Sequence, residues 1–359
     1  MAEVTGPRHG ATPPNMLDVA RHAGVAIGTV SNTINNPDKV RESTRSRVMA
    51  SIEALGFVRN DAARSLAAGS SMTVGLVVAD LGNSFFVDIA RGAETALREH
   101  GMNLLIANSD VKFEKQQTYI EVFEQARVAG ILLAPLDPHV TNSLVSKSVS
   151  RPLVLVNYMS DTGNYSGVAA DERRGGYLAA RHLIELGRTE LLFVGGPFML
   201  QAVAERLSGV EQAVGETPGT RLGLVETTGM NIAHGRSAGL RIADGEFHAD
   251  GVVAASDLLA VGLIQELERG NHARIPQDIA VVGYDNNHFA SESTTPVTTV
   301  SQPGEEMGRV AAEFLLEEIN GESPQIKRSV VLPPHLIVRH SSMGSDWRAA
   351  DDSDERSAG

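Results

Sequence analysis

The stretch LDVARHAGVAIGTVSNTIN, residues 17–35, decides the fold of the amino-terminal part of the chain. Apolar residues recur in it at helical spacing and are interrupted once, at Gly24. This pattern predicts two short helices joined by a tight turn, a helix-turn-helix. The first apolar stripe comprises Leu17, Val19, Ala20 and Ala23, and the second comprises Val25, Val30 and Ile34.

The second predicted helix has an outer face of small and amide-bearing residues. Such groups can lie against phosphates and base edges in the major groove of DNA. A polar outer face is also what an ordinary solvated helix shows, so the pattern by itself leaves both interpretations open. The residues of this face are Ile27, Gly28, Thr29, Ser31, Asn32 and Asn35.

Two further segments follow the predicted helix-turn-helix. Residues 40–56 predict a third helix, in which apolar positions recur up to Leu55 and Gly56 is placed to end the helix. The segment NDAARSLAAGS occupies residues 60–70. It is too short to persist alone, because isolated helices below about 12–15 residues are marginal in water. We expect it to fold only where a partner holds it.

The elements DVA, AGV, TVS, IN and ARSLA stand in an order and spacing that resembles the LacI/GalR (lactose-repressor) family of bacterial transcription regulators. The resemblance runs from about Asn15 to about Ser342, and residues 15–70 carry its most specific part. It implies a small all-α helix-turn-helix headpiece. An α/β two-lobed periplasmic-binding-protein-like body with two doubly wound parallel sheets is implied to follow.

The resemblance also implies which headpiece residues contact DNA. Ala26 stands where the family usually has a serine that caps the recognition helix. Ile27 and Gly28 occupy base-reading positions, where their side chains offer no hydrogen bond, whereas Asn32 can pair with adenine. We therefore expect direct base reading to be sparse. The implied phosphate-contacting positions are held by Thr29, Ser31, Asn35 and Thr44.

Residues 61–70 match the hinge helix of the family. The resemblance implies that two such helices meet in the minor groove of the operator, where Leu66 wedges into a base step and bends the DNA. Ala63 and Arg64 are implied to lie against the same groove. The pattern alone is equally consistent with a simple tether.

Composition bounds the class of protein. The chain has 359 residues, of which 42% are hydrophobic, only 4% aromatic and 35 are glycine, as in an Ala/Val/Leu-rich α/β protein. Cysteine is absent, which excludes disulfides and thiolate metal sites. No apolar run approaches the roughly 20 residues that span a bilayer, and the first residues lack the apolar core of a secretory signal. We expect a cytoplasmic protein.

The net charge of −13 is unusual for a DNA-binding protein, but the charge is unevenly distributed. Residues 15–70 contain seven basic and five acidic residues, so this segment is positive and the remainder carries the negative charge. A small basic module can bind phosphates when it is tethered to an acidic body. The charge therefore does not exclude a nucleic-acid partner.

From Met72 onward, apolar strand-like runs alternate with amphipathic helices, which implies parallel sheets covered on both faces. The strands are too many for one small sheet, so we expect two lobes. Nothing in the last residues resembles the leucine heptads of tetrameric family members, which favours a dimer. The predicted bounds are a disordered tail at 1–14, headpiece at 15–60, hinge helix at 61–70, first lobe at 72–165 and 296–328, second lobe at 166–295 and 329–343, and a disordered tail at 344–359.

Ligands of parallel α/β sheets bind beyond the carboxyl ends of the strands, and polar or aromatic residues occur at several of these ends. By resemblance, Arg206 and Asp285 grip the effector, which suits a hydroxylated or anionic molecule. They can equally form a structural ion pair. Leu200 and Ala202 make one wall apolar and disfavour a purine corepressor. The predicted effector-binding residues are Phe85, Phe86, Asn157, Tyr158, Arg206, Asp257 and Asp285.

We therefore expect a homodimeric transcription regulator, a repressor that binds a pseudo-palindromic operator and responds to a sugar-like small molecule between its lobes. No cofactor, metal site or catalytic residue is expected, because no GxGxxG, Walker A or HExxH motif occurs. Two rivals stay open on the same scaffold. A solute-binding protein conflicts with the attached headpiece, and an enzyme has no nameable nucleophile or metal cluster.

Overall fold

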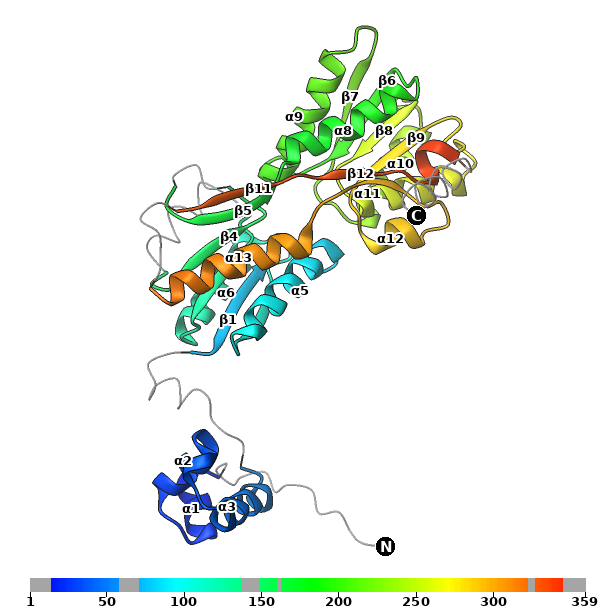
Figure 1. Cartoon of the computed structure of the whole chain (residues 1–359). Helices are drawn as coiled ribbons and strands as arrows, with labels where there is room; N and C mark the ends of the chain where they lie inside the picture. Colours follow the sequence, from blue (N-terminus) through cyan, green and yellow to red (C-terminus); the bar gives the residue numbers. More distant parts are fainter. Residues whose placement is uncertain (1–13, 58–70, 137–148, 160–162, 322–326, 345–359) are drawn as a thin grey trace, which may run out of the picture. The chain divides into compact units, whose positions relative to one another are not determined.

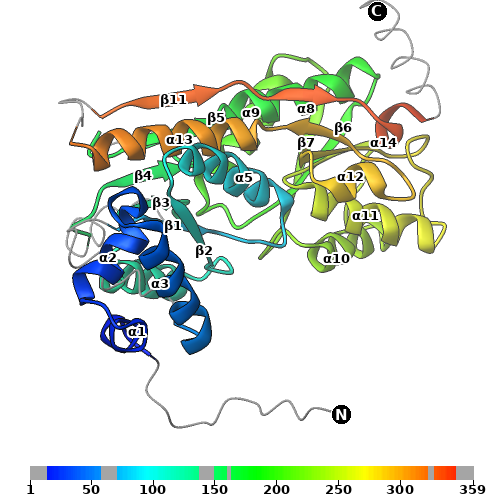
Figure 2. The same cartoon turned by 60° about the horizontal axis from the view of Figure 1, so that its bottom comes forward.

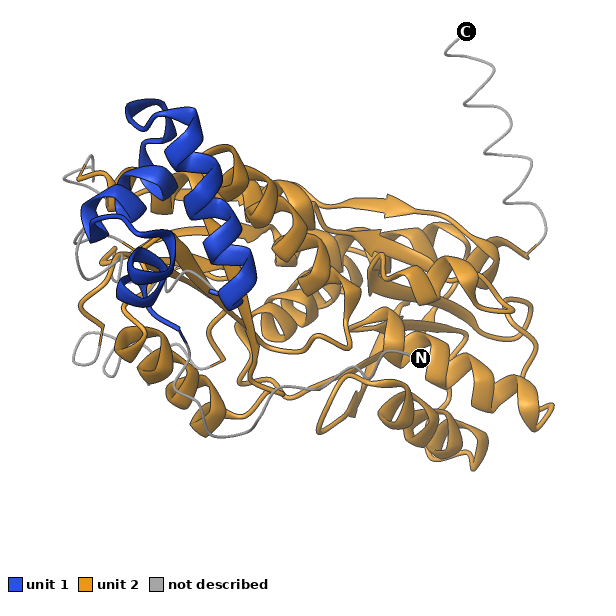
Figure 3. Ribbon diagram, turned by 90° about the horizontal axis from the view of Figure 1, so that it is seen from below, with its two compact units in different colours: residues 1–70 blue, residues 71–359 orange. Residues whose placement is uncertain are grey.

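The computed structural model describes residues 14–57, 71–136, 149–159, 163–321 and 327–344. Residues 1–70 and 71–359 form two separate compact units, and Figure 3 colours them differently. The predicted hinge residues Ala63, Arg64 and Leu66 lie outside the described residues. The predicted tails do too, apart from Pro14 and Gly344.

The first unit contains the predicted helix-turn-helix and a third helix. Asn15 begins the first helix, because its side chain accepts hydrogen bonds from the backbone N–H groups of Leu17 and Asp18, while Asp18 accepts from the N–H of Asn15. Gly24 ends this helix in the left-handed conformation, as the sequence predicts. The elements are α1 (Met16–Ala23), α2 (Ile27–Asn35), the 3-10 turn η1 (Pro37–Lys39) and α3 (Glu42–Leu55).

The core of the headpiece differs from the prediction at one position. Leu17 was placed in the inner stripe of α1, but it is 45% exposed. Met16 packs against the core instead, because residues 16, 19, 20 and 23 have the spacing of one helix face and residue 17 does not. The fully buried core residues are Val19, Ala20, Ala23, Val30 and Val48.

The second unit is a two-lobed α/β body built on two six-stranded sheets (Figure 1). The first sheet has the order β11-β5-β4-β3-β1-β2, and its neighbouring strands all run parallel. Its strands are β1 (Thr73–Val78), β2 (Asn103–Asn108), β3 (Gly130–Leu133), β4 (Leu153–Val156), β5 (Ser166–Ala170) and β11 (Ser329–Leu332).

The second sheet has the equivalent order β12-β10-β9-β8-β6-β7. It is parallel except for β12, which pairs antiparallel with β10. The predicted fold class of two doubly wound parallel sheets is thus confirmed, with this one exception. Its strands are β6 (Glu190–Gly195), β7 (Arg221–Glu226), β8 (Gly251–Ala254), β9 (Ala280–Asp285), β10 (Thr298–Ser301) and β12 (His335–Ile337).

The strand pairing corrects the predicted lobe boundaries. β5 and β11 belong to the first sheet, although the sequence placed residues 166–170 and 329–332 in the second lobe. β10 belongs to the second sheet, although residues 298–301 were placed in the first. The chain therefore passes from one lobe to the other after β5, after β10 and after β11. The predicted bounds place each of these passages just before the strand. These strands have only four or five residues, too few for periodicity to assign.

Helices cover both faces of each sheet. In β1, Val74, Leu76 and Val78 pack beneath α5 and α13, while Val77 faces α6, as the alternation of side chains along a strand requires. The helices of the first lobe are α5 (Ser84–Glu99), α6 (Phe113–Gln125) and α13 (Gly304–Ile319). Those of the second are α8 (Glu172–Glu185), α9 (Gln201–Gly215), α10 (Ile232–Ala243), α11 (Asp257–Arg269), α12 (His288–Glu292) and α14 (His340–Met343). No helix in the described ranges is long and apolar enough to cross a membrane.

Three helix pairs cross at reciprocal glycines, and the pair α5/α13 is visible in Figure 2. A Cβ on Gly92 of α5 would lie 1.8 Å from the carbonyl oxygen of Glu305, and one on Gly308 of α13 would lie 1.9 Å from that of Ile89. Such backbone contact is possible only without side chains at the crossing. The other two pairs are Gly176 with Gly209 between α8 and α9, and Gly235 with Gly262 between α10 and α11.

We predict that Gly308→Ala destabilises the body by about 1–3 kcal/mol, because the added methyl group forces two closely packed helices apart. Gly215→Ala is the matched control, since a Cβ there meets nothing within 4 Å, and alanine favours the helix by up to about 1 kcal/mol. Urea unfolding monitored by circular dichroism measures both variants. Equal unfolding free energies for Gly308→Ala and the wild type would contradict this account of the crossing.

Candidate functional site

A hollow on the headpiece collects several of the residues that the sequence predicted to contact DNA. Ala26, Thr29, Asn32 and Thr44 line it together with three cations, which come from η1, the residue before α3 and α3 itself. The hollow is therefore polar and positively charged, as a surface for a phosphate backbone has to be. The lining residues are Val25, Ala26, Thr29, Asn32, Lys39, Val40, Arg41, Thr44 and Arg47.

The other predicted residues of α2 lie beside this hollow. Ile27 is 50% exposed, and Gly28 and Asn35 are also exposed, whereas Ser31 is half-buried and accepts a hydrogen bond from the side chain of Asn35 at 3.3 Å. No side chain caps α2 at Ala26, in agreement with the absence of the usual serine. Lys39, Arg41 and Arg47 contribute to the positive charge of residues 15–70, but no sequence pattern assigns them to this surface.

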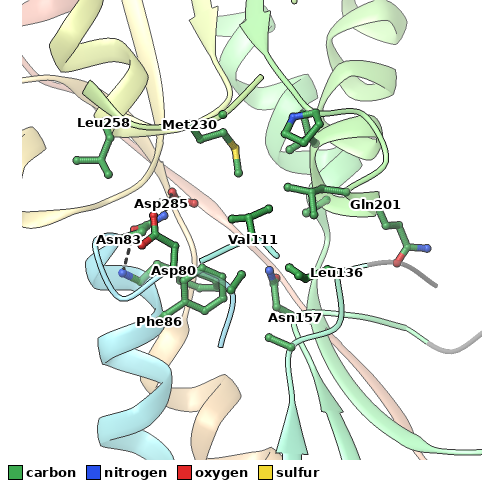
Figure 4. Close-up of a pocket in the computed structure, with 18 of the residues that line it drawn as sticks. Asp80, Asn83, Phe86, Val111, Leu136, Asn157, Gln201, Met230, Leu258 and Asp285 are labelled. Carbon is green, nitrogen blue, oxygen red and sulfur yellow. Dashed lines mark hydrogen bonds between the residues drawn. The ribbon is translucent and has the colours of Figure 1, made fainter. Parts of the chain in front are cut away.

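The second candidate site is a cleft between the two lobes of the body, shown in Figure 4. It holds about 910 Å³ of space counted out to the solvent. Its walls come from the carboxyl ends of strands in both sheets, as parallel sheets require. The lining residues are Ala79, Asp80, Asn83, Phe85, Phe86, Val111, Ala134, Pro135, Leu136, Asn157, Pro197, Leu200, Gln201, Ala202, Val203, Arg206, Thr228, Gly229, Met230, Leu258 and Asp285.

Five of the seven predicted effector-binding residues line this cleft, namely Phe85, Phe86, Asn157, Arg206 and Asp285. Phe85 and Phe86 lie in the first turn of α5, and Asn157 follows β4 with a positive φ of 56°. Asp285 ends β9 with a φ of 103°, a strained conformation for a residue other than glycine. The predicted apolar wall is also present, because Leu200 and Ala202 both line the cleft.

Two predicted residues lie elsewhere. Tyr158 is 4% exposed and packs in the core of the first lobe with residues of α6, because successive side chains at a strand end point to opposite sides and Asn157 takes the side of the cleft. Asp257 is fully buried at the start of α11, where it accepts a hydrogen bond from the backbone N–H of Asn287 at 2.6 Å. A position at the end of a strand is therefore not sufficient to bring a side chain into the cleft.

Arg206 lies in the second turn of α9. Its Nε and Nη2 donate to the two carboxylate oxygens of Glu172 at 2.8 and 3.1 Å, and its Nη1 donates to the backbone oxygen of Ala255 at 2.6 Å. Asp285 lies 3.5 Å from Nη2, and the ring of Tyr284 stacks 3.8 Å from the guanidinium carbon. The structural ion pair that the sequence left open is therefore present.

Asp285 also joins the two lobes. Its Oδ2 accepts a hydrogen bond from the side-chain amide of Asn83, in the first lobe, at 2.6 Å, and its Oδ1 accepts from Gln302 at 2.7 Å. The oxygen of Asn83 accepts in turn from Asn287 of the second lobe at 3.1 Å. The dashed bond in Figure 4 shows the contact between Asn83 and Asp285. One carboxylate thus faces the cleft, the buried Arg206 and the opposite lobe.

Burial dominates the electrostatics of this cluster. It raises the pKa of Asp285 to about 6, although Arg206 and the hydrogen bonds from Asn83 and Gln302 favour the ionised form. Burial and the charge of Asp285 raise the pKa of Asp257 well above its usual value. Burial alone would lower the pKa of Arg206, but Glu172 and Asp285 raise it overall.

Sequence reasoning missed Asp80, Asn83, Glu172 and most of the apolar wall. Asp80 and Asn83 stand just after β1 in ADLGNSFF, so the rule that placed Asn157 in the cleft applies to them as well. No sequence pattern marks Glu172, which contacts Arg206 only because α8 and α9 pack together. In the part of the chain that the structure describes, no group of three or more His, Cys, Asp or Glu residues could hold a metal ion.

Comparison with known families gives two matches. Residues 15–60 match "Bacterial regulatory proteins, lacI family", and residues 180–342 match "Periplasmic binding protein-like domain". The chain is 30% identical over 329 residues to "HTH-type transcriptional repressor PurR" of Vibrio parahaemolyticus, which covers 90% of this chain and 97% of the relative. It is 32% identical over 332 residues to "HTH-type transcriptional regulator RegA" of Clostridium saccharobutylicum, with coverages of 92% and 99%.

Comparison with solved structures also finds transcription regulators of similar fold. "Transcriptional regulator CelR-cellobiose complex" is 31% identical with a TM-score of 0.67, covering 92% of this chain and 100% of that chain. The lac repressor dimer bound to operator and the anti-inducer ONPF is 23% identical with a TM-score of 0.78, covering 92% and 99%, and shows the fold. On the strength of the full-length relatives, the chain belongs to the lacI family of bacterial regulatory proteins, as a transcription regulator with a helix-turn-helix headpiece and a periplasmic-binding-protein-like body.

Proposed function

We propose that this regulator is a repressor that binds a pseudo-palindromic operator as a homodimer, with an affinity set by a sugar-like molecule in the cleft. The observation that carries the proposal is Asp285, which lines the cleft and bonds across it to Asn83 of the other lobe. A ligand that hydrogen-bonds to Asp285 engages the same carboxylate that makes this cross-lobe contact. It therefore couples occupation of the cleft to the closure of the lobes.

The headpiece hollow supports the DNA-binding part of the proposal. Lys39, Arg41 and Arg47 supply positive charge beside Asn32, whose exposed amide can pair with adenine. Ala26, Ile27, Gly28, Thr29, Ser31, Asn35 and Thr44 complete the proposed contact surface. Ala63, Arg64 and Leu66 keep the hinge role that the family implies, in a segment outside the described residues.

The homodimer is supported by uncovered apolar side chains on the edge strands. Leu105 and Ile106 of β2 are both about half-exposed, and consecutive strand residues point to opposite faces, so neither face of β2 is covered there. Leu224 on β7, the corresponding edge of the second sheet, is exposed as well. A second copy packed along these edges would bury them.

A sugar-like effector is supported by the cleft and by related structures. Phe85, Phe86, Asn157, Arg206 and Asp285 are proposed to hold it, and Phe86 offers an aromatic ring to a sugar. CelR is a regulator solved with cellobiose, and a LacI family regulator from Enterococcus faecium, 28% identical with a TM-score of 0.66, is solved with ribose. The apolar Leu200 and Ala202 disfavour a purine. We do not assign effector contacts to Tyr158 and Asp257, because both are buried away from the cleft lining.

We further propose that the protein has no catalytic activity and acts in the cytoplasm, where its DNA partner is. The alternative that the chain is a solute-binding protein gives the helix-turn-helix headpiece no role. The enzyme rival requires a reactive group, whereas the charged groups that line the cleft in the described ranges are Asp80, Arg206 and Asp285. Ligand-dependent release from an operator distinguishes all three classes, and duplexes selected from a random library supply that operator.

We predict that Asn32→Ala and Arg47→Ala weaken operator binding in different ways. Losing the amide of Asn32 costs about 1–3 kcal/mol and relaxes base preference at one position of each half-site. Losing the charge of Arg47 weakens all duplexes alike and reduces the salt slope by about one. Fluorescence anisotropy at several salt concentrations measures both, with Arg21→Ala on the outer side of α1 as control. Equal affinity of the wild type for selected and unrelated duplexes would contradict operator recognition.

We predict that Leu105→Glu converts the dimer to a monomer, because a charge buried at the proposed interface is strongly disfavoured. Val122→Glu, an equally exposed apolar position on α6, is the control and should stay dimeric. Sedimentation velocity reads the oligomeric state. A wild type that sediments as a monomer at micromolar concentration would remove the basis of the homodimer.

We predict that Asp285→Asn weakens effector binding by about 1.5–3 kcal/mol, or one to two decades in dissociation constant, while operator binding without effector is retained. Asparagine keeps the size of the side chain but removes its charge and turns an amide donor toward either Asn83 or Gln302, both of which donate to Asp285. Asp244→Asn, exposed at the end of α10, is the control. Calorimetry with a sugar found by thermal-shift screening provides the affinity, and an unchanged value would show that the ligand binds elsewhere.

A further inference from the structure

We propose that the cleft selects uncharged, hydroxyl-rich ligands and rejects phosphorylated or carboxylated ones, and that Glu172 sets this selectivity by neutralising Arg206 from behind. The inference rests on the proposed effector role of the cleft and adds the charge class of the ligand. It also names a specificity-determining residue that does not itself line the cleft.

The charge of the cleft lining is the first observation. Its ionisable side chains in the described ranges are Asp80, Arg206 and Asp285, of which one is a cation and two are acids. Glu172 adds a third carboxylate directly behind the lining, 2.8 Å from the Nε of Arg206. The local charge is therefore negative even though an arginine faces the ligand. Bringing an anion into this buried cluster means placing it beside carboxylates of the same sign.

The pairing of Arg206 with groups of the protein is the second observation. The carboxylate of Glu172 accepts hydrogen bonds from Nε and Nη2 of the guanidinium, and the carbonyl oxygen of Ala255 accepts one from Nη1. Asp285 approaches Nη2 from the side of the cleft. Both Arg206 and Glu172 are more than nine-tenths buried, so water does not screen this pairing. Three of the five N–H donors of the guanidinium are therefore used inside the protein, and Glu172 occupies the Nε/Nη2 edge that could otherwise hold a phosphate by two hydrogen bonds.

The surplus of acceptors is the third observation. The side chain of Asn157 points into the cleft from the first lobe (Figure 4), and its Oδ1 is buried without a hydrogen-bond partner among the described residues. The carboxylate of Asp285 can accept further bonds beyond those from Asn83 and Gln302. A buried acceptor without a donor is costly. The complementary ligand is one that brings hydrogen-bond donors, as sugar hydroxyls do.

The position of Glu172 is decided by a helix crossing. A Cβ on Gly176 of α8 would lie 1.9 Å from the carbonyl oxygen of Arg206 on α9, so the two backbones touch one turn away from Glu172. This contact holds the carboxylate against the guanidinium. Glu172 is thus a positioning residue that acts through Arg206, and removing its charge frees a buried cation that faces the cleft.

The test uses the full-length protein and matched pairs of probes at constant ionic strength, namely ribose with ribose 5-phosphate, glucose with glucose 6-phosphate, and inorganic phosphate alone. Calorimetry and thermal shift are measured for the wild type, Glu172→Gln, and the double variant Glu172→Gln with Arg206→Gln. The double variant lacks both charges and corrects for the general stabilising effect of phosphate on proteins. Circular dichroism checks that each variant is folded.

We expect the wild type to show no more stabilisation by phosphate or sugar phosphates than the double variant. Glu172→Gln should bind inorganic phosphate at least roughly tenfold more tightly than the wild type, as one freed charge-assisted contact provides. A wild type that prefers a phosphorylated sugar over its parent overturns the proposal. So does a folded Glu172→Gln whose phosphate affinity equals that of the wild type.

Two remaining outcomes are also decisive. If Glu172→Gln does not fold, the measurement on the wild type decides. Phosphate binding to the wild type beyond the general stabilising effect of phosphate contradicts the proposal, and the absence of such binding supports it. If no sugar of either kind binds the wild type, the sugar-like effector of the proposed function fails. The phosphate comparison between wild type and Glu172→Gln then still decides whether Glu172 excludes anions.

Discussion

The buried pairing of Arg206 with Glu172 and Asp285 is the interaction on which the arrangement of the cleft depends. It is possible because α8 and α9 cross with backbone contact at Gly176, which brings a carboxylate of one helix within 2.8 Å of the guanidinium of the other. Burying three ionised groups is costly unless they satisfy one another. The cluster therefore holds α8, α9 and the end of β9 in one geometry.

The same cluster explains how a ligand in the cleft can affect the whole body. Asp285 is hydrogen-bonded to Asn83, which also begins α5 by accepting from the N–H of Phe85. A change in the contacts of Asp285 thus alters the hydrogen bonding at the start of α5, the helix that packs against α13 in the first lobe. Close-packed helices shift as units because their contacts leave no room for gradual adjustment. Linkage between effector and operator then requires only that the two lobe arrangements differ in DNA affinity.

The negative charge of the chain has a consistent physical meaning in this arrangement. The headpiece places three of its cations, Lys39, Arg41 and Arg47, around one hollow, whereas the cleft carries an excess of carboxylates. Under the proposed function, a polyanionic partner is attracted to the first surface and an anionic small molecule is disfavoured in the second. One protein can therefore discriminate between an anionic macromolecule and a neutral metabolite by separating the two charge patterns along the chain.

The sequence by itself determined the helix-turn-helix, the fold class and about a third of the cleft lining, because these follow from local rules. Gly24 ends α1 through its own conformation, and Asn157 and Asp285 reach the cleft because parallel strands share one carboxyl edge. The sequence misplaced Leu17 and the short strands β5, β10 and β11, where four or five residues carry no usable periodicity. Only the tertiary structure decided that Tyr158 and Asp257 turn away from the cleft and that Glu172 pairs with Arg206. These outcomes depend on the packing of segments distant in sequence, and no local pattern encodes the distance between two helices.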